Sequence, residues 1–259
     1  MGAIDSDILL KLKNNFLPLG GVVLMVIILA KRRRILHVCR RATGPLVLVF
    51  FQSFIFPKKT VHALKRALFD TMRMQTERLG RPLEIVEIGA GTGENFLFFP
   101  ENSQVTIVEP MEGCQKYIQK NMQTFGKHVT LKAIKVGFGE KMDEILDEGT
   151  FDAAVLCEVL CETRDTKKFL EQTYRILKPG GKLYVMQHAP GKKHGMEYRL
   201  MSLINPVWKA ATTCNMLGDY LPIIKAVGFT DIDMEHLEKP LFSNYWPIIR
   251  TRLIGRATK

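Results

Sequence analysis

Three glycines at alternating positions, Gly89, Gly91 and Gly93, follow directly after the apolar segment Glu84–Ile88. This segment has the length and composition of a buried β-strand, and helix-compatible residues follow from Glu94 onward. Glycine adopts left-handed turn conformations that other residues avoid, and it lets a ligand lie against the backbone. A strand, a glycine turn and a helix in this order predict an α/β fold that binds a ligand at the carboxyl end of its first strand.

The chain beyond Leu83 continues to alternate between β-rich apolar segments and helical ones. This alternation indicates βαβ units, and therefore a mostly parallel sheet with helices on both faces. Six further strands are predicted at Val105–Val108, Val129–Val136, Ala153–Cys157, Lys182–His188, Thr230–Met234 and Ile249–Ile254. Helices are predicted near Asn95–Phe99, Gly113–Phe125, Lys141–Leu146 and Thr166–Leu177, with another between Tyr198 and Cys214.

An acidic residue, Glu109, ends the second predicted strand, twenty residues after Gly89. At this separation a carboxylate reaches the ribose hydroxyls of a bound nucleoside. A dinucleotide site has the spacing GxGxxG, which leaves room for a pyrophosphate at the helix start. This chain instead has GxGxG followed by Glu94, which would repel a pyrophosphate, whereas Glu87 suits a ligand with an amino group and a sulfonium. The pattern favours a cationic nucleoside cofactor without phosphates.

The first 59 residues differ in character from the rest of the chain. They hold ten Lys and Arg against two Asp, which is +8 of the formal net charge of +11. The other 200 residues carry only +3, so the basic charge does not indicate a nucleic-acid-binding surface, and no nucleic-acid partner is expected. The cations flank two apolar runs, Phe16–Ala30 and Gly44–Pro57, as cations flank membrane segments.

The form of the membrane attachment stays open, because each apolar run is short for a helix that crosses a bilayer. A single anchor helix and a hairpin that enters one leaflet both fit. Gly2 also lies in a myristoylation pattern, which the sequence leaves undecided. Apolar residues at helical spacing from Val61 to Met72 predict an amphipathic helix that ends at Gly80. The chain thus divides into a membrane-anchoring segment (1–59), an amphipathic helix and linker (60–82) and an α/β domain (83–259).

Five cysteines are spread along the chain: Cys39, Cys114, Cys157, Cys161 and Cys214. Their number is odd and no CxxC pair occurs, so neither a disulfide framework nor a zinc site is expected. A reducing compartment is the simpler assumption.

Four motifs, in order, resemble class I S-adenosylmethionine-dependent methyltransferases. They are similar to the family's glycine motif (Val86–Gly93), its acidic motif (Ile107–Pro110), its fourth strand (Phe151–Cys157) and its turn before the fifth strand (Leu177–Leu183). Within this superfamily the chain resembles the membrane-anchored thiol S-methyltransferases of the endoplasmic reticulum and lipid-droplet surface. That second resemblance rests on the apolar leader, Gly93–Phe96, Gly139–Met142, Leu160–Cys161 and His188.

The resemblance implies a Rossmann-like fold with a seven-stranded sheet, S-adenosylmethionine as cofactor, and a catalytic domain on the cytosolic side of the membrane. The cofactor-binding residues that it implies are Glu87, Gly89, Ala90, Gly91, Gly93, Glu109, Pro110, Gly139, Glu140 and Cys157. Many class I enzymes place a carboxylate near the position of Phe138 to bind the adenine amino group. The apolar residue here leaves stacking or backbone contacts for the adenine.

His188 is the candidate general base, because it ends the fifth predicted strand, where parallel sheets of this kind bind ligands. A purely structural histidine is the alternative. Cys157 and Cys161 are expected to line the site and not to act as nucleophiles, since methyl transfer to an acceptor needs no covalent enzyme intermediate. The segment His194–Leu217 is rich in methionine and aromatic residues, which suits an adaptable apolar lid.

The expected activity is S-methylation of small lipophilic thiols at a membrane surface. A thiolate is intrinsically nucleophilic, so alignment and exclusion of water supply much of the acceleration. The sequence lacks the [DN]PP[YF] tetrapeptide that follows the fourth strand in many enzymes that methylate nucleobase amines. Methylation of oxygen, nitrogen or carbon in a lipid or quinone-like acceptor is an alternative. A cofactor-binding membrane scaffold without turnover is another, and the oligomeric state is not indicated.

Overall fold

The computed structural model describes residues 58–238 and 251–259 of the 259-residue chain. Both apolar runs of the predicted membrane-anchoring segment lie outside these residues, so their role stays a prediction. Among the described helices, none is both long and apolar enough to cross a membrane.

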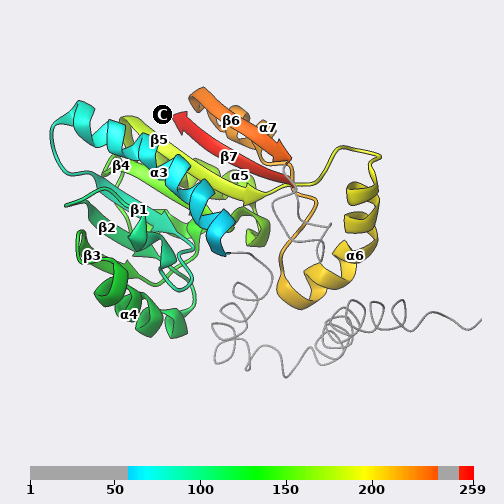
Figure 1. The fold of residues 1–259 in the computed structure, drawn as a ribbon, viewed down its shortest axis with the longest axis horizontal. Coiled ribbons are helices and arrows are strands. Elements are labelled where there is room, and N and C mark those ends of the chain that lie inside the picture. Colours follow the sequence, from blue (N-terminus) through cyan, green and yellow to red (C-terminus); the bar gives the residue numbers. More distant parts are fainter. Residues whose placement is uncertain (1–57, 239–250) are drawn as a thin grey trace, which may run out of the picture.

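A seven-stranded sheet forms the centre of the described part (Figure 1). Its strands are β1 (Glu84–Ile88), β2 (Gln104–Val108), β3 (Thr130–Lys135), β4 (Phe151–Cys157), β5 (Leu177–His188), β6 (Thr230–Glu238) and β7 (Thr251–Thr258). The order across the sheet is β3-β2-β1-β4-β5-β7-β6, and β7 runs antiparallel to both of its neighbours. The strand order reverses between β1 and β4, and ligands bind beyond the carboxyl ends of the strands at such a switch point.

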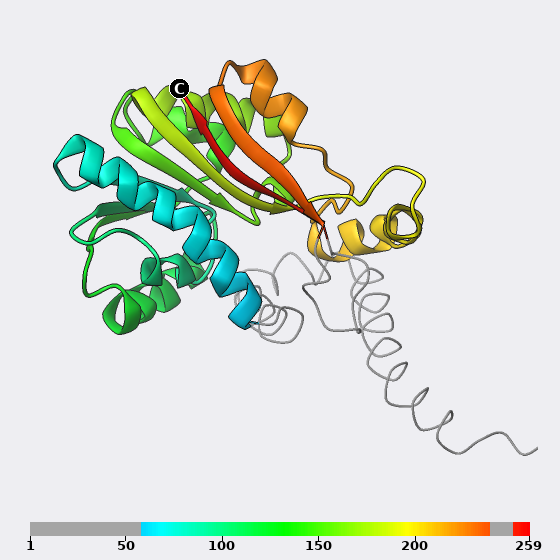
Figure 2. The same ribbon diagram turned by 45° about the horizontal axis from the view of Figure 1, so that its top comes forward.

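Helices cover both faces of this sheet (Figure 2), as the sequence predicts. Helices α3 (Lys58–Leu79) and α4 (Gln115–Phe125) share one hydrophobic core with inward-facing residues of β1, β2, β4 and β5. Helices α5 (Thr166–Ile176) and α7 (Leu221–Val227) share a second core on the opposite face. The predicted amphipathic helix is α3, which buries Leu68 and Met72 and ends at Gly80 in a left-handed turn.

Helix α6 (Met196–Thr212) lies beyond the carboxyl end of β5 (Figures 1 and 2). It forms a small hydrophobic cluster with the loop that follows it, in which Met201 and Met216 are fully buried and Trp208 packs against them. The segment predicted as a lid is therefore a helix with its own core at the ligand-binding edge of the sheet.

Several predicted elements differ from those observed. The helices expected at Asn95–Phe99 and Lys141–Leu146 are short 3-10 turns, η1 (Glu94–Leu97) and η3 (Gly139–Glu144), and α7 was not predicted. The last strand was predicted to stop at Ile254, but β7 continues to Thr258. Gly255, with a φ of 146°, lies within β7, at a position where a Cβ would collide with the backbone of Asp233 on β6.

Candidate cofactor and acceptor site

In the glycine turn after β1, Gly89 is closely packed whereas Gly91 has open space beside it. Gly89, Gly91 and Gly93 all have left-handed φ angles, of 73°, 56° and 77°. The backbone N–H of Gly89 donates to the carbonyl of Val108 at 2.8 Å, and a Cβ at Gly89 would collide with the side chain of Val159. A Cβ at Gly91, by contrast, would have no heavy atom within 4 Å. The backbone at Gly91 and the neighbouring half-buried Ala90 therefore present an accessible surface.

Glu109 lies beside this turn, at the end of β2. Its Oε2 accepts a hydrogen bond from the Gly91 N–H at 2.8 Å, and its Oε1 accepts one from the Met111 N–H at 3.0 Å. Only 3% of the residue is exposed, and this burial raises the pKa of its carboxyl although both backbone hydrogen bonds oppose the rise. Pro110 follows it on the surface. The structure thus brings the acidic motif against the glycine motif.

A second carboxylate, Glu87, lies buried at the end of β1. Its Oε1 accepts a hydrogen bond from Asn95 Nδ2 at 2.6 Å, while its Oε2 has no hydrogen-bond partner among the described residues. Burial raises the pKa of Glu87 to about 7, against the opposing effects of Asn95 and Lys65. A buried carboxylate oxygen without a partner fits a cationic ligand group, such as the amino group of S-adenosylmethionine.

The residues predicted beside the adenine lie after β3. Gly139 packs directly against the ring of Phe169, leaving no room for a Cβ. Glu140 accepts a hydrogen bond from the Arg164 backbone N–H at 2.8 Å, so its carboxylate joins two loops. The Phe138 ring is half exposed, with the Arg164 guanidinium 5.3 Å from its centroid.

An ion pair between the partly exposed Glu158 and the buried Arg252 links the end of β4 to β7. Glu158 follows β4 with a φ of 58°, and its Oε2 also accepts a hydrogen bond from the backbone N–H of His188 at 3.1 Å. Burial lowers the pKa of Arg252 to about 10. Arg252 was not predicted from the sequence, because it belongs to no motif and reaches this place only through the pairing of β7 with β5.

Cys157, the last residue of β4, lies close to this ion pair. Burial raises its pKa to about 11, which leaves the thiol protonated near neutral pH. Its place in the wall of the cofactor site stays a prediction.

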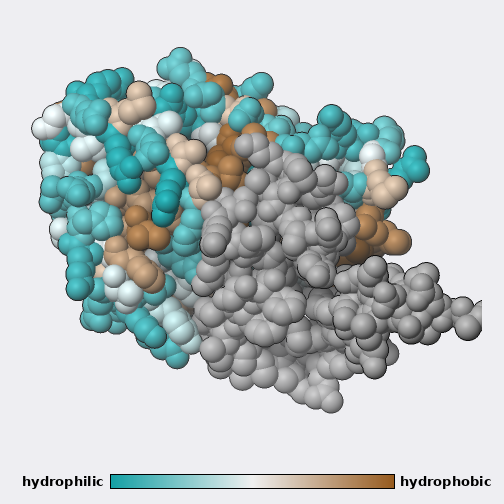
Figure 3. Space-filling view, in the orientation of Figure 1, coloured by the Kyte–Doolittle hydropathy of each residue, from teal (hydrophilic) through white to brown (hydrophobic). Residues whose placement is uncertain are grey.

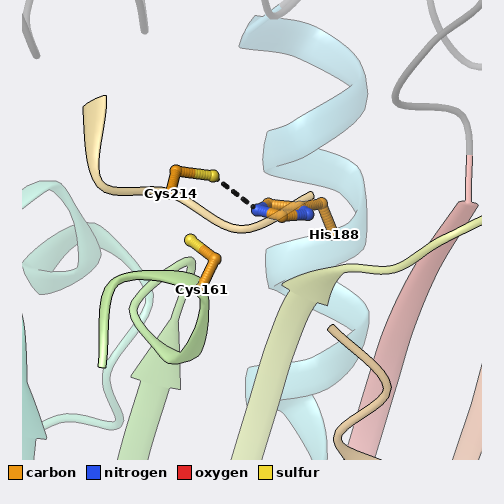
Figure 4. Close-up of side chains that lie close together, drawn as sticks. All are labelled: Cys161, His188 and Cys214. Carbon is orange, nitrogen blue, oxygen red and sulfur yellow. Dashed lines mark hydrogen bonds between the residues drawn. The ribbon is translucent and has the colours of Figure 1, made fainter. Parts of the chain in front are cut away.

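His188, at the carboxyl end of β5, lies near the side chains of Cys161 and Cys214 (Figure 4). Its Nε2 lies 3.2 Å from Cys214 Sγ, and its buried Nδ1 has no hydrogen-bond partner among the described residues. The pKa of Cys214 lies well below its usual range, and the hydrogen bond from Cys161 is the largest cause. Together with hydrogen bonds from His188 and Trp208, it outweighs burial, which would raise this pKa. The position of Cys214 beside His188 was not predicted, because Cys214 comes 53 positions after Cys161 and no spacing motif connects the two cysteines.

A comparison with known protein families identifies the family to which the chain belongs. Residues 60–220 match the family model described as a methyltransferase domain. The chain belongs to this methyltransferase family. It is an S-adenosylmethionine-dependent methyltransferase, and S-adenosylmethionine is its cofactor. The residues around the glycine turn fit this group, since Glu87 offers an unpartnered carboxylate oxygen and Gly91 an open backbone.

Curated relatives of this methyltransferase include thiol S-methyltransferases. The chain is 28% identical to human thiol S-methyltransferase TMT1A over 196 residues, which cover 75% of this chain and 78% of the relative. It is 27% identical to human thiol S-methyltransferase TMT1B over 213 residues, covering 81% and 85% of the two chains. The resemblance expected from the sequence is thereby confirmed.

Solved structures share the fold of this methyltransferase. The CurJ carbon methyltransferase has a TM-score of 0.62 at 15% identity and covers 100% of this chain and 72% of its own. A possible histamine N-methyltransferase from Thermotoga maritima has a TM-score of 0.55 at 20% identity and covers 86% and 99%. At these identities the likeness shows the fold alone.

Proposed function

We propose that this methyltransferase methylates the sulfur of small lipophilic thiols. The observation that carries the proposal is the similarity to thiol S-methyltransferases over three quarters or more of the chain. Carbon, nitrogen and oxygen methyltransferases share the fold or part of the sequence, so the fold itself does not select the acceptor atom.

In such a reaction, one group of described residues would bind the cofactor and another would act on the acceptor. S-adenosylmethionine supplies a methyl group carried on a sulfonium. On the cofactor side, Glu109 would bind the ribose hydroxyls and Glu87 the amino group, while Gly91 lets the ligand lie against the backbone. On the acceptor side, Nδ1 of His188 would accept the proton of the thiol, because it is buried and has no other partner among the described residues.

The surface of α6 supports an apolar acceptor. Met196, Leu203 and Val207 recur at a spacing that places them on one face of this helix, and they are 86%, 76% and 43% exposed. Hydrophobic surface is visible over α6 at the right of Figure 3. An apolar face beside the ligand-binding edge suits substrates that partition into a bilayer.

We also propose that the segment 1–59 anchors the chain to a membrane, of the endoplasmic reticulum or of lipid droplets, with the catalytic domain in the cytosol. The charge distribution supports this, since +8 of the net charge of +11 flanks the two apolar runs. Separation of membranes from soluble protein, with and without residues 1–59, tests the attachment. Recovery of the full chain in the soluble fraction would contradict it.

A matched series of acceptors tests the choice of atom. The full chain in detergent is given S-adenosylmethionine and 1-octanethiol, 1-octanol or octylamine, which differ only in the nucleophilic atom, and S-adenosylhomocysteine release is measured. We expect release with the thiol, at a rate reduced at least about tenfold in His188→Gln. Release with the alcohol or amine alone would contradict the thiol proposal. Cofactor binding without release on any acceptor would favour a scaffold.

A further inference from the structure

Three side chains that commonly bind metals converge at the edge of the sheet where the site lies (Figure 4). Cys161 comes from the 3-10 turn η4 (Leu160–Glu162), His188 ends β5, and Cys214 lies in the loop after α6. The two sulfurs and a ring nitrogen all lie within 4.8 Å of one another. The three residues come from distant parts of the sequence, so their meeting is a property of the fold.

We infer that Cys161, His188 and Cys214 form a zinc-binding site. Two thiolates and one imidazole are a ligand set that Zn²⁺ prefers. Tetrahedral zinc, with bonds of about 2.3 Å to sulfur and about 2.0 Å to nitrogen, places its ligand atoms roughly 3.5–3.8 Å apart. Nε2 and the Cys214 sulfur, at 3.2 Å, are already near this separation. A contraction of about 1 Å at the widest pair would complete the geometry.

Hydrogen bonds between neighbouring residues hold the three ligands in place. The Leu160 N–H, next to Cys161, donates to Oε1 of Gln187, next to His188, at 2.9 Å. The Asn215 N–H, next to Cys214, donates to the carbonyl of Cys161 at 2.8 Å. Each loop is therefore fixed to the next one independently of the ligand side chains. When the ligand side chains are already held in place, less conformational entropy is lost on metal binding, so the site binds more tightly.

Three protein ligands leave the fourth position of the zinc to water or another small ligand, as in catalytic zinc sites. The metal would join the segment after α6 to the ends of β4 and β5, and so fix the lid helix relative to the sheet. Zinc on Nε2 would also keep the ring proton on Nδ1. His188 could therefore accept the proton of the thiol only in the zinc-free chain, a consequence that rests on the proposed function.

Metal binding by the full chain, reduced and freed of metal by chelation, tests the inference without any assay of methyl transfer. After Zn²⁺ is added back in excess, we expect one Zn²⁺ per chain to remain bound after desalting. We also expect Co²⁺ to give the sulfur-to-metal charge-transfer absorption that thiolate ligands produce. The cobalt spectrum of the unaltered chain reports thiolate ligation directly, so this part of the test does not depend on the folding of a variant.

Conservative substitutions then assign the ligands. Cys161→Ser, Cys214→Ser and His188→Gln should each weaken zinc binding by at least about tenfold, as loss of a ligand requires. Cys114→Ser, which removes a buried thiol outside the cluster, should bind zinc as the unaltered chain does. The inference is overturned if the reduced chain retains no zinc, if cobalt shows no thiolate absorption, or if Cys161→Ser and Cys214→Ser bind zinc as tightly as Cys114→Ser. None of these results depends on which acceptor the enzyme methylates.

Discussion

The backbone N–H of Gly91 donates to Oε2 of Glu109 at 2.8 Å, and this contact joins the glycine turn after β1 to the end of β2. Of the three glycines in this turn, only Gly91 has open space where a Cβ would be, within the described structure. Its backbone N–H is also the one that donates to Glu109. The turn that we propose to receive the cofactor and the carboxylate that we propose to bind its ribose are therefore directly hydrogen-bonded to each other.

Gly91→Ala should separate cofactor binding from folding. Gly91 and Gly149 have similar φ angles, of 56° and 61°, and a Cβ at either position would have no heavy atom within 4 Å. Both alanine variants should therefore lose a similar amount of stability, roughly 1–2 kcal/mol, from left-handed strain. Only Gly91→Ala should also weaken S-adenosylmethionine binding in calorimetry, by about tenfold or more. Equal affinities in the two variants would show that the cofactor does not lie against Gly91.

Glu109→Gln should weaken cofactor binding by roughly 10- to 100-fold, because a hydrogen bond to a charged group contributes about 1.5–3 kcal/mol. Glu112→Gln is the matched control, since Glu112 is an exposed carboxylate three residues further along the chain. Calorimetry of both variants gives the comparison. If Glu112→Gln lost as much affinity, the effect would be one of overall charge and not of a specific contact.

Binding of S-adenosylmethionine should strengthen as the pH rises through 7. Burial raises the pKa of Glu87 to about 7, so the free protein holds a proton there at pH 6 and has lost it by pH 8. A cationic amino group beside Glu87 favours the ionised form, so binding would release this proton and gain roughly tenfold in affinity between pH 6 and pH 8. Glu87→Gln should remove this dependence. An unchanged pH profile in Glu87→Gln would assign the effect to another group.

The fold should lose stability in acid through Asp152. Burial alone would raise the pKa of this carboxyl, but hydrogen bonds from Arg81, the Glu84 N–H and Lys178 outweigh it and bring the pKa to about 2. The ionised form therefore stabilises the fold above pH 4 by roughly 2 kcal/mol, and this contribution disappears as the pH falls toward 2.

Urea unfolding of Asp152→Asn at several pH values measures the Asp152 contribution. The variant should be less stable than the unaltered chain at pH 7, and the difference should shrink as the pH falls from 4 toward 2. A difference that stays constant over this range would mean that the ion pairs do not cause it.

Strands β1, β2 and β4 were predictable from the sequence because they are short, mostly apolar segments followed directly by a glycine or a glutamate. Glu84–Ile88 was located to the residue, and Glu109, predicted at the end of the second strand, directly follows β2. The short elements failed because η1 and η3 are single 3-10 turns whose residues also suit an α-helix.

The acceptor side of the site was only partly predictable. His188 could be found because it ends a strand of a parallel sheet, where ligands bind. Cys214 and Arg252 could not, since one lies in a loop after α6 and the other reaches the site through antiparallel pairing at the far end of the chain. The expectation of no zinc site rested on the absence of a CxxC pair, and sequence spacing does not reveal that Cys161, His188 and Cys214 come together in the fold.

The most direct test of the account follows the methyl group itself. The full chain in detergent is incubated with S-adenosylmethionine that carries a trideuterated methyl group and with 1-octanethiol, and the products are identified by mass spectrometry. The account predicts octyl trideuteromethyl sulfide together with S-adenosylhomocysteine, both strongly reduced in Gly91→Ala and retained in Gly149→Ala. Absence of the labelled sulfide under conditions in which the chain binds the cofactor, or label found only in oxygen or nitrogen acceptors, would contradict it.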